Sequence, residues 1–109
     1  MTENSRSKVD KIVVLPLYKS GVKKLKKNHN KEVLEKLSEI VDDLVNFKIS
    51  TEHKNNMLVN TKGKMELHVD ADILLIYRYD GDILYIELKL LAVTTHDKLQ
   101  HTLKQLKNE

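Results

Sequence analysis

Two histidines in the second half of the chain stand where acid–base chemistry is possible. His68 is followed four residues later by Asp72, just before the apolar run Ile73–Tyr77, and His96 comes after the next apolar segment. An imidazole titrates closer to neutral pH than other side chains do, so it can take or give a proton at a phosphate group without a metal ion. His68, Asp72 and His96 are therefore candidates for proton transfer.

Alternating side chains predict the strands that carry these residues. From position 65 to position 70, apolar residues alternate with polar ones, which gives a strand one apolar face and one face with functional groups. Asp80-Gly81 favours a two-residue hairpin turn, which would pair Tyr79 with Asp82. This register places Asp72 on the open sheet face opposite the helices, where His68 can join it. The predicted core face of the hairpin consists of Ile73, Leu75, Tyr77, Leu84, Ile86 and Leu88.

The first half of the chain predicts one strand and two helices. The β-branched run Ile12–Leu15 is typical of an edge strand and ends at Pro16. Ser20 is expected to cap a brief helix, which Asn28-His29-Asn30 interrupts. The clearest helix follows, because apolar residues recur at spacings of three and four from Val33 to Val45. Two antiparallel helices joined by a short turn are the expected arrangement.

The end of the chain completes the predicted fold. Leucines at positions 99, 103 and 106 have helical spacing and predict a short C-terminal helix, with Thr94 or Thr95 near its cap. The fold class is therefore α+β: an N-terminal strand, two antiparallel helices, an antiparallel β meander and a short C-terminal helix. We expect residues 1–109 to form a single domain in which residues 1–10 are flexible.

The segment from position 48 to position 64 shows no periodicity. It contains Asn55-Asn56 and Gly63, so it predicts a mobile loop without regular structure. The loop is basic and holds His53, Lys54, Lys62 and Lys64. These lysines could hold RNA phosphates, or they could be ordinary loop lysines.

Composition limits the possible compartments and partners. The chain has 109 residues, no cysteine and a polar N-terminus, and no apolar run approaches the ~20 residues that a membrane-spanning helix needs. We expect a cytoplasmic protein without a membrane partner. The net charge of +3 conceals a basic block, because residues 1–31 contain nine lysines and arginines and two acids. Such a block can bind a polyanion such as RNA or an acidic protein, or it can simply be a hydrated surface.

The motifs around the two histidines resemble the YafQ branch of the RelE/ParE toxin superfamily, the small ribonucleases of bacterial type II toxin–antitoxin pairs. The family pattern has a histidine, an aspartate four residues later and a Leu-Leu-Ile-Tyr strand, which stands here as His68, Asp72 and Leu74–Tyr77. A later Thr-His before a short apolar segment is similar to Thr95-His96. The similarity runs from the first strand to the terminal hairpin and implies a RelE-like fold.

This resemblance implies a ribosome-dependent endoribonuclease that cuts mRNA and is held inactive by an antitoxin protein. Cleavage through the neighbouring 2′-hydroxyl needs a base, an acid and positive charge around the phosphate, which histidines and lysines supply. We expect His68 and His96 to form the proton-transfer pair and Asp72 to act as orienting group or base. His53 resembles an earlier family histidine and is expected to be an auxiliary catalytic group. No cofactor or metal is expected.

The expected RNA-binding residues surround this site. They are Lys54, Lys62, Lys64 and Gln100, the last of which stands four positions after His96, where the family has an aromatic residue. Two alternatives stay open. The three histidines His53, His68 and His96 could bind zinc together with Asp72, although no tight ligand spacing favours this. The chain could also be a non-catalytic or attenuated member of the fold that binds a target or only its antitoxin.

Overall fold

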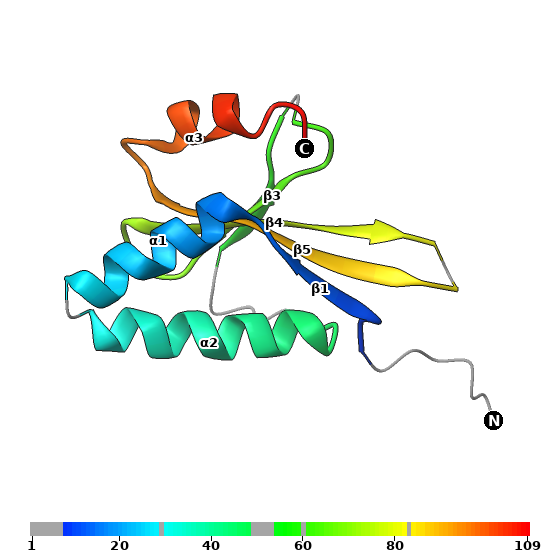
Figure 1. The fold of residues 1–109 in the computed structure, drawn as a ribbon. Helices are drawn as coiled ribbons and strands as arrows, with labels where there is room; N and C mark the ends of the chain where they lie inside the picture. The colour runs from blue at the N-terminus through cyan, green and yellow to red at the C-terminus, as the bar shows by residue number, and fades with distance from the viewer. Residues whose placement is uncertain (1–7, 29, 49–53, 60, 83) are drawn as a thin grey trace.

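The computed structural model describes residues 8–28, 30–48, 54–59, 61–82 and 84–109 (Figure 1). Its strands and helices follow one another as β1 (Lys11–Val14), α1 (Pro16–Lys27), α2 (Lys31–Val45), β2 (Asn55–Met57), β3 (Met65–His68), β4 (Ile73–Gly81), β5 (Ile86–Thr95) and α3 (Leu99–Gln105). A strand, two helices, a meander and a short C-terminal helix therefore occur in the predicted order, and the predicted α+β fold class is confirmed.

A single five-stranded sheet joins the described strands in the order β1-β5-β4-β3-β2. β3, β4 and β5 are antiparallel neighbours, as a meander requires, whereas β1 pairs with β5 in parallel. A parallel pair needs a long connection, which α1 and α2 begin. The predicted edge strand is confirmed as β1, at the end of the sheet.

Helix α2 covers one face of the sheet. Four residues of its apolar stripe are almost fully buried: Val33, Leu37, Ile40 and Leu44. They belong to a core that includes Leu75, Tyr77 and Leu88 of the sheet. Each such side chain contributes about 1.5–3 kcal/mol by leaving water. The Tyr79 hydroxyl donates a hydrogen bond to the Leu44 carbonyl, which ties β4 to the end of α2.

Helix α3 lies on the opposite side of the sheet (Figure 1). Beneath it, Leu74 and Ile76 of β4 form a second core with Leu106, which follows the helix. The Thr94 and Thr102 hydroxyls share a buried hydrogen bond of 2.8 Å that links β5 to α3. The prediction of an open face was therefore wrong here, because the C-terminal helix covers part of it. Burial on both faces explains the unbroken apolar run of β4.

Helix α1 starts earlier than predicted. It begins at Pro16 rather than near Ser20, because proline fits the first helical turn, where its missing N–H loses no hydrogen bond. The helix lies against β5, where a side chain carbon on Gly21 would stand 2.5 Å from the Val93 carbonyl oxygen. Glycine therefore permits a close approach of α1 to the strand. The predicted interruption between the helices is confirmed, since α1 ends at Lys27.

The register of the β4–β5 hairpin differs from the prediction. Asp80-Gly81 ends β4 instead of forming the turn, and Tyr79 pairs with Leu88 rather than with Asp82. The Asp82 carboxylate accepts hydrogen bonds from the Leu84 and Tyr85 amides, at 2.8 and 3.1 Å, and so forms the turn itself. Leu84 is consequently 79% exposed at the hairpin tip and does not belong to the core.

A short strand lies in the segment that was predicted to lack regular structure. Residues Asn55–Met57 form β2, which pairs with β3 at the sheet edge, and the Tyr77 hydroxyl donates to the Asn55 side chain at 2.8 Å.

Near the N-terminus, Val9 is buried and the Asp10 carboxylate accepts a hydrogen bond from the Ile86 amide at 2.7 Å. Residues 1–10 were expected to be flexible, but Val9 and Asp10, at the end of this stretch, are anchored to the rest of the fold. No helix among the described residues has the length and apolar character needed to span a membrane.

Candidate active site

The end of β3 carries the first half of the site. Glu66 and His68 are two residues apart on the strand, so they share one face, while Leu67 between them points into the core. His68 Nε2 lies 3.1 Å from Glu66 Oε1, and the two side chains are 21% and 13% exposed. Partial removal of water strengthens the attraction between a carboxylate and a protonated imidazole. Glu66 can therefore hold the His68 ring in place.

The turn after β5 carries the second half. Ile73 pairs with Thr95, so the residues next to them, Asp72 and His96, lie side by side. His96 Nδ1 is 3.5 Å from Asp72 Oδ1, and the two side chains are 44% and 67% exposed. The amide of Lys98 donates to the Thr95 carbonyl at 3.2 Å and closes this turn. His96 is thus the more accessible imidazole, and it has a carboxylate partner of its own.

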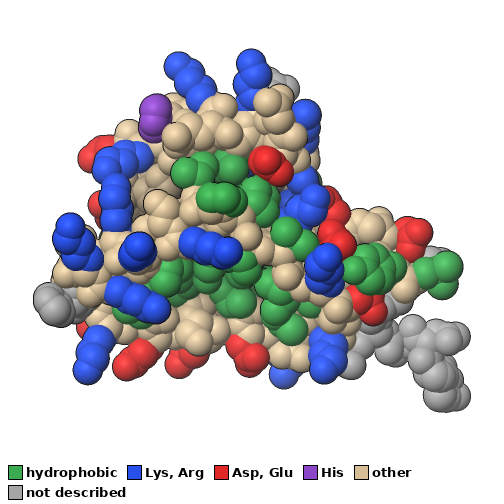
Figure 2. All heavy atoms as spheres, viewed as in Figure 1, with side chains coloured by type: hydrophobic (Ala, Val, Ile, Leu, Met, Phe, Trp, Pro, Cys, Tyr) green, Lys and Arg blue, Asp and Glu red, His purple; other side chains and the backbone are tan. Residues whose placement is uncertain are grey.

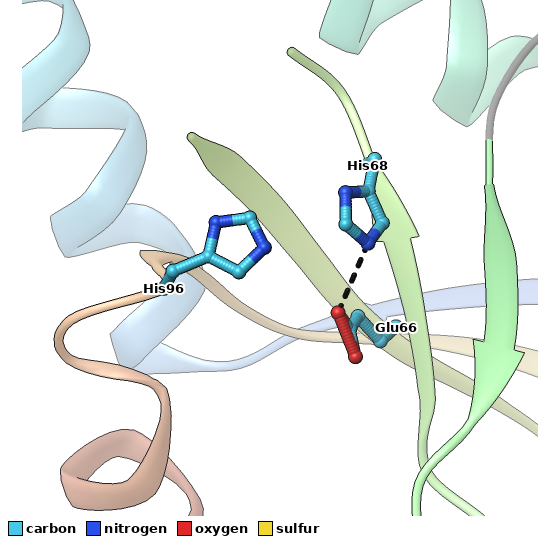
Figure 3. Close-up of side chains that lie close together, drawn as sticks. All are labelled: Glu66, His68 and His96. Atoms are coloured by element: carbon cyan, nitrogen blue, oxygen red, sulfur yellow. Dashed lines mark ion pairs between the residues drawn. The ribbon is translucent and has the colours of Figure 1, made fainter. Parts of the chain in front are cut away.

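The two imidazoles meet in space although 28 positions separate them in the sequence. Figure 3 shows the His68 and His96 rings near each other, with Glu66 beside His68. The ring centroids are 5.2 Å apart and the ring planes differ by 53°. Rings this close can both reach one phosphate group. Two imidazoles, each beside a carboxylate, are an arrangement suited to moving one proton onto a substrate and another off it.

The predicted catalytic residues are brought together with one change and one addition. Asp72 contacts His96, whereas His68, with which it was expected to act, is paired with Glu66. Sequence reasoning missed Glu66 as a site residue, although its place two positions before His68 on an alternating strand was a usable signal. His53 lies outside the described residues.

Lys64 occupies a different environment from the one predicted. Its side chain is almost fully buried, at 1% exposure, and its Nζ donates to the Thr61 carbonyl at 2.9 Å. Burial, and then the charges of Arg78 and Lys62, lower the pKa of this ammonium. The structural effect of Lys64 is to fasten the turn that precedes β3.

The other predicted RNA-binding residues are divided between two places. Lys62, Lys64 and Gln100 line a groove of about 500 Å³ between residues 58–64 and α3. The side chains around the two imidazoles, Glu66, His68, Asp72 and His96, do not line this groove. Lys54 is exposed and lies next to the site, because its carbonyl accepts a hydrogen bond of 2.9 Å from the His68 amide. The structure therefore brings Lys54 to the site through the backbone.

The same side chains include a possible metal-binding set. One ligand atom from each of Glu66, His68 and His96 lies within 4.8 Å of the other two. Imidazole nitrogens and a carboxylate oxygen are donors that zinc and copper(II) accept. Glu66 takes the place that the sequence gave to Asp72, because the strand alternation places it beside His68.

Comparisons with known proteins agree with this architecture. The model of the family described as "Bacterial toxin of type II toxin-antitoxin system, YafQ" matches residues 10–101. Escherichia coli YafQ has a TM-score of 0.70 at 24% identity, covering 81% of this chain and 94% of that one. The E. coli DinJ–YafQ complex gives 0.68 at 25%, with 84% and 97% covered. A metal-bound toxin from Helicobacter pylori gives 0.68 at 23%, with 82% and 97% covered. Among proteins of curated function, none matches this sequence.

Proposed function

Because the chain belongs to the YafQ family of bacterial type II toxins, we propose that it is an endoribonuclease that cleaves mRNA by histidine acid–base catalysis. The observation that carries this proposal is the pair His68 and His96, with ring centroids 5.2 Å apart and a carboxylate beside each ring. Family membership gives the toxin role, and the pair supplies the chemistry.

The proposed reaction uses the 2′-hydroxyl of the RNA as its nucleophile. One imidazole, in its neutral form, removes the 2′-hydroxyl proton, and the 2′-oxygen bonds to the adjacent phosphorus. The bond from phosphorus to the 5′-oxygen breaks, and the other imidazole, in its cationic form, gives that oxygen a proton. The products are a 2′,3′-cyclic phosphate and a free 5′-hydroxyl. Proton transfer of this kind contributes about 10²–10⁴-fold in rate for each group.

In this scheme, each carboxylate positions a different imidazole ring. Asp72 orients His96, and Glu66 holds His68, so each ring is fixed by a partner of its own. Neither carboxylate needs to touch the substrate, so both are positioning residues.

The partners follow from the toxin role. We propose that the mRNA is cut while it is bound to the ribosome and that a cognate antitoxin protein inhibits the chain. E. coli YafQ, which has the same fold, has been crystallised together with DinJ. A disordered antitoxin segment that becomes ordered as it crosses the toxin surface would bind in a manner suited to tight and reversible control.

Induced expression of the chain in bacteria tests the proposal. We expect growth arrest and new RNA 5′ ends, and we expect His68→Gln or His96→Gln to reduce cleavage about 100-fold or more. His29→Gln, which changes a histidine far from this motif in the sequence, is the matched control and should behave like the unaltered chain. Arrest that persists in both site variants, without new 5′ ends, would instead indicate a non-catalytic toxin that acts by binding.

A second candidate function is metal-dependent inhibition of the same site. The closeness of Glu66, His68 and His96 favours it, and a related H. pylori toxin has been crystallised with metal bound. A metal ion on both imidazoles would remove them from proton transfer. Titration calorimetry with zinc and with copper(II) should detect binding to the chain and much weaker binding to Glu66→Gln. Equal binding by both proteins would exclude this cluster as the site.

A further inference from the structure

A groove beside the histidines is not used by the proposed chemistry. It has a volume of about 650 Å³ and lies between α1, the second half of β5 and the turn that leads to α3. Thr95 and Asp97, the residues on either side of His96, line it. The groove therefore reaches the edge of the candidate active site.

The walls of this groove are fixed by the sheet edge. β1 accompanies β5 only as far as Leu90, so the rest of that strand has no neighbouring strand on this side. α1 takes its place, and Gly21 lets the helix approach the Val93 carbonyl. The backbone of the helix therefore packs directly against the backbone of the strand beside the groove. Leu25 and Val93 contribute apolar surface to it.

Two lysines from different elements meet at the rim. Lys24 of α1 and Lys98, which precedes α3, both line the groove and are exposed. The neighbouring Lys98 amine lowers the pKa of Lys24. Within the described part of the chain neither lysine forms an ion pair, and Asp97 is the acid that lines the groove. Two neighbouring ammonium groups repel each other, and an anion between them removes that cost.

We propose that this groove holds the RNA strand next to the cleaved bond, with Lys24 and Lys98 gripping one backbone phosphate. This inference rests on the proposed ribonuclease function. Leu25 and Val93 offer an apolar floor to a ribose or base, which suits a single strand bound without base pairing. Figure 2 shows that basic side chains, which are lysines in this helix, gather over α1, so the approach to the groove is basic.

Binding of an RNA that cannot be cleaved tests the groove separately from catalysis. The probe is a single-stranded 2′-O-methyl oligoribonucleotide, and fluorescence anisotropy gives Kd for the full chain from 50 to 300 mM salt. Loss of one phosphate contact reduces the slope of log K against log salt by about 0.7. The double variant Lys24→Ala/Lys98→Ala should show this change and about tenfold weaker binding at 50 mM salt. Lys24→Arg/Lys98→Arg should retain binding.

The matched control removes the same charge elsewhere. Lys26→Ala/Lys31→Ala changes two exposed lysines that do not line the groove, and it should retain most of the slope. Equal weakening in both double variants would overturn the proposal. Unchanged RNA binding by Lys24→Ala/Lys98→Ala would also overturn it. This includes the outcome in which the variant binds RNA normally and loses only its binding to polyglutamate, an acidic peptide. If the variants show the expected RNA-binding pattern but the unaltered chain cleaves no mRNA, only the ribonuclease function would be overturned.

Discussion

At the scale of single residues, the candidate site is an arrangement of two imidazole–carboxylate pairs. His68, Asp72 and His96 could be predicted from the sequence because their residue types and spacing suggested proton transfer. Their pairing could not, since it depends on which neighbours strand register brings within 3.5 Å. Glu66 was visible as a strand neighbour of His68, but a glutamate on an alternating strand is usually only a hydrated surface residue.

The pairing predicts unequal effects of the two carboxylates. Glu66→Gln should reduce cleavage about tenfold or more, because it removes the charge that holds the less exposed ring, His68. Asp72→Asn should reduce it less, since Asp72 is 67% exposed and 3.5 Å from His96. Initial rates of mRNA cleavage, with circular dichroism to verify folding, measure both. A larger loss in Asp72→Asn would contradict the assignment of Glu66 as the stronger positioning group.

At the scale of elements, periodicity was a reliable guide to α2 and β3, because one buried face determines each pattern. The β4–β5 register failed for a chemical reason. The Asp82 carboxylate caps the turn, and this local hydrogen bonding outweighs the preference of Asp80-Gly81 for the central turn positions. β2 was missed because Asn55-Asn56 has low strand propensity and only its pairing with β3 makes it a strand.

The correct register places a charge network across the hairpin and predicts a pH-dependent contribution to stability. Asp80 contacts Arg78 and Lys89, at 2.7 and 3.0 Å, and the hydrogen bond from Arg78 is the largest influence that lowers the pKa of Asp80 below 3.8. Because the folded-state pKa is lowered, this stabilisation is complete above the unfolded-state pKa and is lost as the pH falls through the folded-state value.

We therefore expect Asp80→Asn to lower the free energy of unfolding by about 1 kcal/mol at pH 7. The difference from the unaltered chain should shrink as the pH falls from 3.8, the ordinary pKa of an aspartate, through the lower pKa that Asp80 has in the folded chain. Urea unfolding at a series of pH values measures it. Asp42→Asn, on the exposed side of α2, has no such network within the described residues and serves as the control. A difference independent of pH would mean that the Asp80 charge is not responsible.

At the scale of the whole molecule, the sheet is packed on both faces and this packing sets the positions of the histidines. α2 covers one core, α3 covers the other, and the buried Thr94–Thr102 hydrogen bond connects the second core to the turn that holds His96. The sequence predicted both helices, but it could not show that α3 packs over Leu74 and Ile76, because an apolar strand face does not identify what covers it.

Close packing of α1 against the sheet predicts the cost of enlarging Gly21. Gly21→Ala places a carbon 2.5 Å from the Val93 carbonyl oxygen, so the helix must shift and the free energy of unfolding should fall by about 1–3 kcal/mol. Lys19→Ala, at an exposed position of the same helix, should change stability by less than about 0.5 kcal/mol. Urea unfolding monitored by circular dichroism compares the two. Equal stability of Gly21→Ala and the unaltered chain would contradict the close approach.

The most direct test of two cooperating imidazoles is the pH dependence of mRNA cleavage between pH 5 and pH 9. One histidine must be neutral and the other protonated, so the rate should rise and then fall around neutral pH. In His68→Gln and in His96→Gln, one limb of this curve should disappear along with most of the activity. A rate that stays constant across the range, or keeps both limbs in either variant, would contradict catalysis by this pair.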